Sequence, residues 1–152
     1  MPEVRSVADC RKLVDRKKDK DAPTITAAVG DKYACAAALF EIDAEYPGVL
    51  SHVYLAAGHP GKTVYIPLPL GAAEKVLGDN NFLRRIQAIR YSPELEREFA
   101  DSLAKSRAEA KRLLDKGDEA TARRVLAEMV ERNLELSAKY AKPVKRNKWR
   151  RK

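Results

Sequence analysis

The fold is decided by the stretch SPELEREFADSLAKSRAEAKRLLDKGDEATARRVLAEMVERNLELSAKYA (92–141). Ser92 and Pro93 are typical of a helix start, because a serine hydroxyl can cap free backbone amides and proline is tolerated in the first turn. Gly117 is typical of a helix end, and Asp118 can cap the helix that follows. The stretch therefore predicts two long helices joined by a tight turn, which is an antiparallel αα-hairpin.

Apolar and small residues recur along both predicted helices at alternating spacings of four and three. Such spacing places them on one face of each helix, and we expect the two faces to pack along an interaction seam. Asn133 falls on this seam and needs a hydrogen-bond partner, for which Ser102 and Ser106 are candidates. The large residues of the predicted seam are Phe99, Leu103, Leu113, Leu126, Met129 and Leu136.

The residues before Ser92 carry weaker structural signals. TVYIPLP (63–69) is rich in β-branched and aromatic residues and predicts a short strand, which its two prolines confine to an edge or an end. Alanine-rich ACAAALFEI (34–42) favours a helix. Short helices are expected within 72–77 and 80–91, whereas 24–29 and 49–57 are compatible with either a helix or a strand.

We therefore expect a mainly α fold. It would consist of a compact helical body with one or two short β-strands near 63–68, followed by the αα-hairpin and a basic tail. The expected segments are a basic N-terminal helix and linker (1–22), a small mixed or helical domain (23–91), the hairpin (92–141) and a flexible basic tail (142–152).

Composition bounds the class of protein. The chain has 152 residues, of which 30 are basic and 22 acidic, and its net charge is +8. No apolar run approaches the ~20 residues of a membrane span, so no membrane partner is expected. The start lacks the apolar region of a secretory signal. Two cysteines make no disulfide framework, which indicates the cytoplasm or another reducing compartment, such as a nucleoid, nucleus or organelle interior.

The positive charge is concentrated at the C-terminus. KPVKRNKWRRK (142–152) holds seven of the basic residues and no acid, and a second group of arginines lies within 82–91. Such an arm can displace counterions from nucleic acid, and an interleaved tryptophan can stack on an unpaired base. The expected nucleic-acid-binding residues are Lys142, Lys145, Arg146, Lys148, Trp149, Arg150, Arg151 and Lys152, extended by Arg84, Arg85 and Arg90 if the fold brings them to the same side.

The sequence offers little that indicates phosphate binding, metal binding or catalysis. AAGHPGKT (56–63) fits a relaxed phosphate-binding loop, but two prolines in the following residues oppose the helix that such a loop requires. A turn before a strand is the preferred interpretation. The possible soft metal ligands Cys10, Cys35, His52 and His59 lack metal-site spacing. We expect no catalytic residues, no metal and no cofactor.

Two short segments resemble DNA-binding units. Residues 22–40 resemble a helix-turn-helix core, although their second helix offers few side chains for reading bases. Residues 49–67, VLSHVYLAAGHPGKTVYIP, resemble the helix–glycine-turn–YIP segment of the Mor/C phage activators. Those proteins continue into a helix-turn-helix, which the charged stretch 92–141 does not match, so no residue role is carried over.

The expected function is non-enzymatic nucleic-acid binding, in which the basic C-terminal arm contacts the phosphate backbone. The protein would be a DNA-binding accessory protein or a ribonucleoprotein subunit. The alternative is a protein-interaction or self-association module that works through 92–141. A third hypothesis is a small nucleotide-binding protein that uses 56–63.

Overall fold

The computed structural model describes residues 6–9, 36–60, 62–79, 81–87 and 89–141. About 58% of the described residues are helical, and they include a small three-stranded antiparallel sheet, so the mainly α class holds for this part of the chain. The strands β1 (Ala36–Glu41), β2 (His52–Ala57) and β3 (Ile66–Pro69) lie in the order β1-β2-β3. The helices are α3 (Pro47–Leu50), the short 3-10 helix η2 (Leu70–Ala72), α4 (Ala73–Leu77), α5 (Phe82–Gln87), α6 (Pro93–Leu114) and α7 (Glu119–Ala138).

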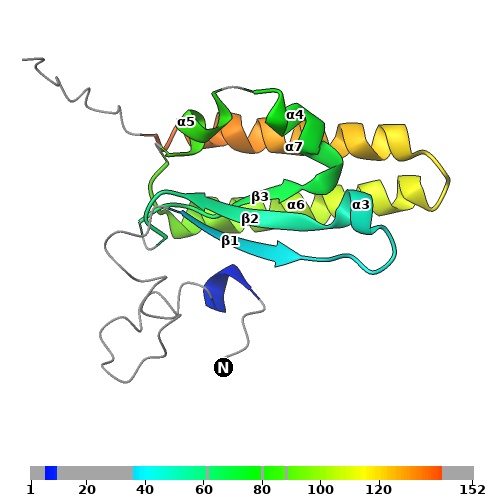
Figure 1. Cartoon of the computed structure of the whole chain (residues 1–152), viewed down its shortest axis with the longest axis horizontal. Coiled ribbons are helices and arrows are strands. Elements are labelled where there is room, and N and C mark those ends of the chain that lie inside the picture. The colour runs from blue at the N-terminus through cyan, green and yellow to red at the C-terminus, as the bar shows by residue number, and fades with distance from the viewer. Residues whose placement is uncertain (1–5, 10–35, 61, 80, 88, 142–152) are drawn as a thin grey trace, which may run out of the picture.

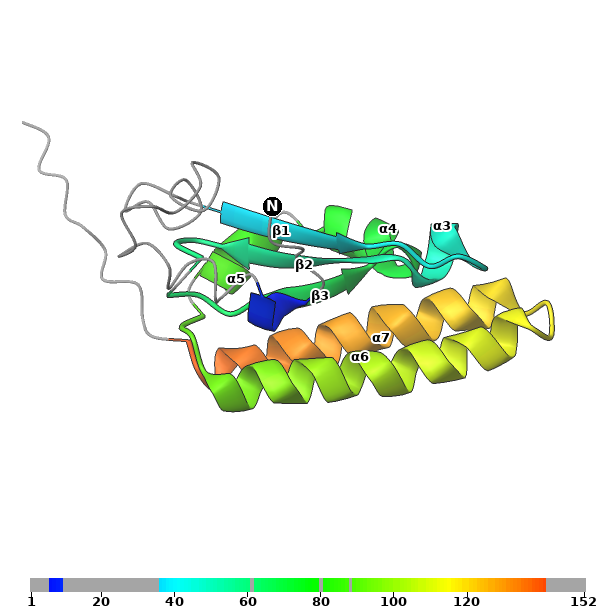
Figure 2. The same cartoon turned by 90° about the horizontal axis from the view of Figure 1, so that it is seen from below.

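The two C-terminal helices begin and end where the sequence places them. The Ser92 hydroxyl accepts a hydrogen bond from the Leu95 amide at 3.3 Å, and the Asp118 carboxylate accepts one from the Thr121 amide at 3.1 Å. Gly117 has a φ of +79°, a left-handed conformation that side chains rarely adopt. The helices α6 and α7 then lie side by side under the sheet (Figure 2).

The buried face of each helix departs from the predicted seam toward its C-terminal end. Phe99, Leu103, Leu126 and Met129 are buried as expected. In α6, however, Leu114 is buried in preference to Leu113, and in α7 Ser137 is buried while Leu136 is only partly covered. The reason is geometric: a spacing of four and three follows a 3.5-residue repeat, whereas a straight α-helix has 3.6 residues per turn, so the buried face drifts.

Asn133 has a different partner from the serines we expected. Its side-chain amide donates to Met129 Sδ at 3.2 Å, one turn earlier on the same helix, and the Ser137 hydroxyl donates to the Asn133 carbonyl at 2.6 Å. Thioether sulfur is a weak acceptor. The buried side-chain amide of Asn133 therefore has its hydrogen-bond partner within α7.

The prediction of a helix over 34–42 is wrong for its described residues. Ala36–Glu41 form β1, which pairs with β2 so that Leu39 lies opposite Tyr54 and Phe40 opposite Val53. Helix propensity is a weak preference that tertiary pairing overrides, and this pairing extends the sheet. The ambiguous stretch 49–57 contains the end of α3 and all of β2, so it has a strand where the Mor/C resemblance implies a helix. Within the described ranges the sheet thus has three strands, whereas one or two were expected.

The layers of the molecule share one hydrophobic core. The α6–α7 pair covers one side of the sheet, while α4 and α5 lie beside β3 and over α7 (Figures 1 and 2). Buried apolar residues from strands and helices form a single cluster, including Ile66, Phe82, Leu95, Phe99 and Leu126. Strand β1 lies at the edge of the sheet, where Phe40 and Ile42 remain 69% and 71% exposed.

Candidate functional site

Three segments far apart in the sequence meet where the described chain ends. Ile89 forms an antiparallel bridge with Ala141, and Arg90 forms another with Thr63. The Tyr91 amide also donates to the Lys62 carbonyl at 3.0 Å. We call this surface, made of residues 62–63, 89–91 and 140–141, the tail root, because the basic residues 142–152 follow directly.

The structure brings the predicted arginines of 82–91 to this end of the molecule. Arg90 belongs to the tail root and is exposed. Arg84 and Arg85 are exposed on α5, which packs against α7. Arg85 forms ion pairs with Asp79 at 2.9 Å and Glu131 at 3.7 Å, which neutralise part of its charge. The predicted binding residues Lys142, Lys145, Arg146, Lys148, Trp149, Arg150, Arg151 and Lys152 lie outside the described residues.

Sequence reasoning missed other exposed residues of the tail root. Lys62 was placed in a turn with no binding role, yet it is exposed beside Tyr91. Tyr91 and Tyr140 were given no binding role either, and they are 42% and 38% exposed. No spacing or motif connects 62, 90 and 140, because only the two bridges bring them together.

A cavity of about 420 Å³ opens between the sheet and the start of α6. Tyr54, Tyr65 and Tyr91 supply aromatic walls, and Glu41 and Glu96 supply carboxylates. The Glu96 carboxylate accepts a hydrogen bond from the Tyr65 amide at 3.1 Å, which ties the first turns of α6 to the chain just before β3. Tyr91 belongs to both the cavity and the tail root.

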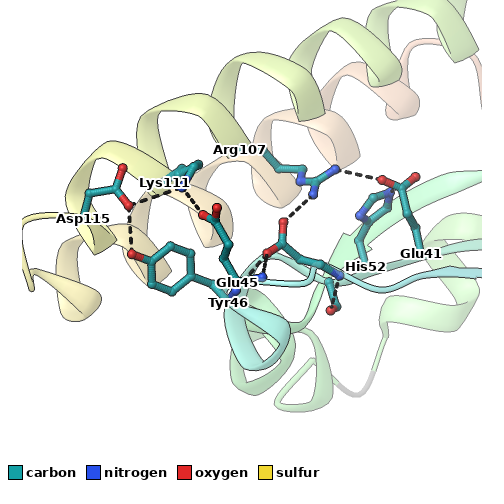
Figure 3. A network of polar contacts seen from close by, with 9 residues as sticks. Glu41, Glu45, Tyr46, His52, Arg107, Lys111 and Asp115 are labelled. Atoms are coloured by element: carbon teal, nitrogen blue, oxygen red, sulfur yellow. Dashed lines mark hydrogen bonds and ion pairs between the residues drawn. The ribbon is translucent and has the colours of Figure 1, made fainter.

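Ion pairs connect the end of β1 and the loop after it to α6 (Figure 3). Arg107 on α6 donates to Glu41 and to Asp43, each at 2.9 Å. Asp43 also accepts the backbone amides of Tyr46 and Glu45 at 2.8 and 3.0 Å. The Tyr46 amide is the main cause of the lowered pKa of Asp43, and Arg107 contributes to it. This carboxylate therefore stays charged and holds the loop closed.

One turn further along α6, a second set of contacts repeats the arrangement (Figure 3). Lys111 forms ion pairs with Glu45 and, at 3.3 Å, with Asp115. The Tyr46 hydroxyl donates to Asp115 at 2.8 Å, which lowers the pKa of Asp115. Because each acid of this network forms an ion pair with Arg107 or Lys111, we interpret the network as a structural clamp between loop and helix.

His52 lies buried beneath this clamp. Neither ring nitrogen forms a hydrogen bond with another described residue, although Nε2 is 3.4 Å from Glu41 Oε2. The ring packs edge-on to Tyr54, with centroids 4.8 Å apart. Burial lowers the pKa of His52 and Arg107 adds to this, while Glu41 opposes it. The adjacent Ser51 hydroxyl accepts the Asp43 amide at 3.0 Å. Among the described residues, no hydrogen bond joins the Ser51 hydroxyl to the imidazole, so the two do not form a nucleophile–base pair.

Acidification should therefore destabilise the protein through His52. An unfolded histidine has a pKa near 6.5, and the lower pKa of folded His52 means that the unfolded chain binds more protons. The contribution of neutral His52 to the free energy of unfolding is fully present above about pH 6.5. The free energy of unfolding then falls as the pH drops below this value. We expect His52→Leu to remove this loss between about pH 7 and 5, as measured by urea unfolding at each pH.

Four carboxylates should cause a separate loss of stability at a lower pH. The pKa values of Asp43, Asp79, Asp115 and Asp118 are lowered, so their contribution is present above their usual value of 3.8 and is lost only as the pH falls further. His59→Gln is the matched control and should retain the loss near pH 6. A His52→Leu protein with the parent's pH profile would contradict this assignment.

The 56–63 loop is a turn between strands. The Lys62 and Thr63 amides both donate to the His59 carbonyl, at 2.8 and 3.1 Å, and β3 follows. Gly58 has a φ of +135°, and a methyl group there would lie 2.6 Å from Thr63 Cγ2. Within the described chain no helix begins at Lys62, so the amide cradle of a phosphate-binding loop is missing.

The described part of the chain holds no group of three or more histidine, cysteine, aspartate or glutamate side chains placed to bind a metal ion. None of its helices is both long enough and apolar enough to cross a membrane. No family model, curated protein or solved structure matches the chain. The site must therefore be interpreted from its own chemistry.

Proposed function

We propose that the protein binds nucleic acid without catalysing a reaction, and that residues 142–152 contact the phosphate backbone together with Arg84 and Arg90. The observation that carries this proposal is the bridge between Ile89 and Ala141. It joins Ala141, the last described residue before the basic segment in the sequence, to the residue next to Arg90, so in this proposal cations separated by about 50 residues in sequence act together. Arg85 contributes less, because Asp79 and Glu131 already pair with it.

In this proposal the two C-terminal helices act as a rigid support for the binding surface. As an αα-hairpin, α6 and α7 would hold α5 and the tail root in place. The large seam residues Phe99, Leu103, Leu126 and Met129 are buried within the chain's own core, where a partner protein would not reach them without opening it. This burial favours the nucleic-acid proposal over an interaction module that works through the seam.

Removing the basic segment is the direct test. A chain ending at Ala141 loses seven cations, and each phosphate neutralised contributes about 0.9 to the slope of log affinity against log salt concentration. We expect weaker binding to DNA or RNA and a slope smaller by up to about six, as measured by fluorescence anisotropy at several salt concentrations. Equal affinity of the two chains at low salt would overturn the proposal.

Single substitutions separate a local effect from net charge. Arg90→Gln and Arg84→Gln remove cations at the basic end, whereas Arg124→Gln removes an exposed cation near the start of α7. Figure 1 shows this start at the opposite end of the helix pair from α5. The first two variants should each lower the salt slope by about one, and Arg124→Gln should leave it unchanged.

A further inference from the structure

In the tail root the backbones of the basic residues Lys62 and Arg90 lie opposite the backbones of two exposed tyrosines. The Tyr91 amide donates to the Lys62 carbonyl at 3.0 Å, so Lys62 and Tyr91 lie on two adjacent segments of the chain. The antiparallel bridge between Ile89 and Ala141 likewise brings together Arg90 and Tyr140, their chain neighbours. Tyr91 and Tyr140 are 42% and 38% exposed, so part of each side chain reaches the surface.

We propose that the tail root binds single-stranded nucleic acid, with phosphates on Lys62 and Arg90 and bases stacked on Tyr91 and Tyr140. This inference rests on the proposed nucleic-acid binding and names the form of nucleic acid that the body recognises. A cation beside an aromatic ring matches one nucleotide of an unpaired strand, because the phosphate and the open face of the base are both available. In a duplex the faces of the bases are covered by their neighbours.

The cavity next to Tyr91 supports the same orientation of the strand. The carboxylates Glu41 and Glu96 line it together with Arg97, and a carboxylate can accept hydrogen bonds from the amino groups of bases. Bases would therefore turn toward the cavity side of Tyr91, and phosphates toward Lys62 and Arg90.

The test compares a 15-nucleotide single strand, as DNA and as RNA, with the matching duplex, using fluorescence anisotropy and the full chain. Tyr91→Leu and Tyr140→Leu remove a stacking ring, whereas Tyr91→Phe and Tyr140→Phe keep it. We expect each leucine variant to bind the single strand roughly ten-fold more weakly, with duplex affinity unchanged. The phenylalanine variants should bind like the parent. Circular dichroism confirms that each variant is folded.

The outcomes separate this inference from the proposed function. If the parent binds none of the three probes at low salt, nucleic-acid binding itself fails. If the parent binds but the leucine variants keep its single-strand affinity, the inference is overturned and the proposed function stands. If Tyr91→Leu does not fold, Tyr140→Leu decides together with photocrosslinking of a 5-bromouracil strand to the parent. Adducts on Tyr91 or Tyr140 support the inference, and adducts confined to 142–152 overturn it.

Discussion

Phe99→Ala should lower the free energy of unfolding by about 3–5 kcal/mol. The Phe99 side chain is 1% exposed and belongs to the cluster that joins α6 to α7 and the sheet. Removing the ring forfeits its burial and leaves a cavity that a helix packed on two sides cannot close. Because small domains are stable by only about 5–15 kcal/mol, this single change would remove a large fraction of the total.

The measurement is urea unfolding followed by circular dichroism, with two leucines of α6 as matched controls. Leu103 is 3% exposed, whereas Leu113 is only partly buried although the sequence spacing places both on the seam. Leu103→Ala should therefore cost about 2–5 kcal/mol and Leu113→Ala distinctly less. Equal losses at the two positions would contradict the drift of the buried face toward Leu114.

Gly71→Ala should cost about 1–3 kcal/mol through overpacking. A methyl group on Gly71 would lie 2.8 Å from Leu126 Cδ1 and 2.9 Å from Val49 Cγ1. It would also lie 3.1 Å from the Val49 carbonyl oxygen, which cannot rotate away as a side chain can. The position marks where η2 passes between α3 and α7, so relief requires the backbone to shift.

Gly48→Ala is the matched control for this substitution. Nothing lies within 4 Å of a methyl group on Gly48, which belongs to α3. Because alanine favours a helix over glycine, we expect no loss of stability there and a gain of up to about 1 kcal/mol. Thermal unfolding of the two variants tests the pair. A Gly71→Ala protein as stable as the parent would show that η2 does not pack closely against α7.

Prediction from the sequence succeeded where local chemistry decides the outcome. Ser92, Gly117 and Asp118 mark helix ends through capping groups and a left-handed φ, which depend on a few neighbouring residues. The prolines of 63–69 likewise oppose a helix wherever they occur. It failed at β1, because alanines tolerate a strand when a neighbouring strand supplies the hydrogen bonds, and that strand lies at 52–57.

In the candidate site, too, some features follow from the sequence and others depend on the tertiary structure. The sequence by itself determined that the chain's excess positive charge lies in its last eleven residues and that two long helices precede them. Only the tertiary structure decided which residues lie beside Ala141, the last described residue before that segment. The bridges from Thr63 to Arg90 and from Ile89 to Ala141 bring Lys62, Arg90, Tyr91 and Tyr140 together. Residues so far apart become neighbours because the shared core packs α5, α7 and the sheet against one another, and no spacing along the chain records that packing.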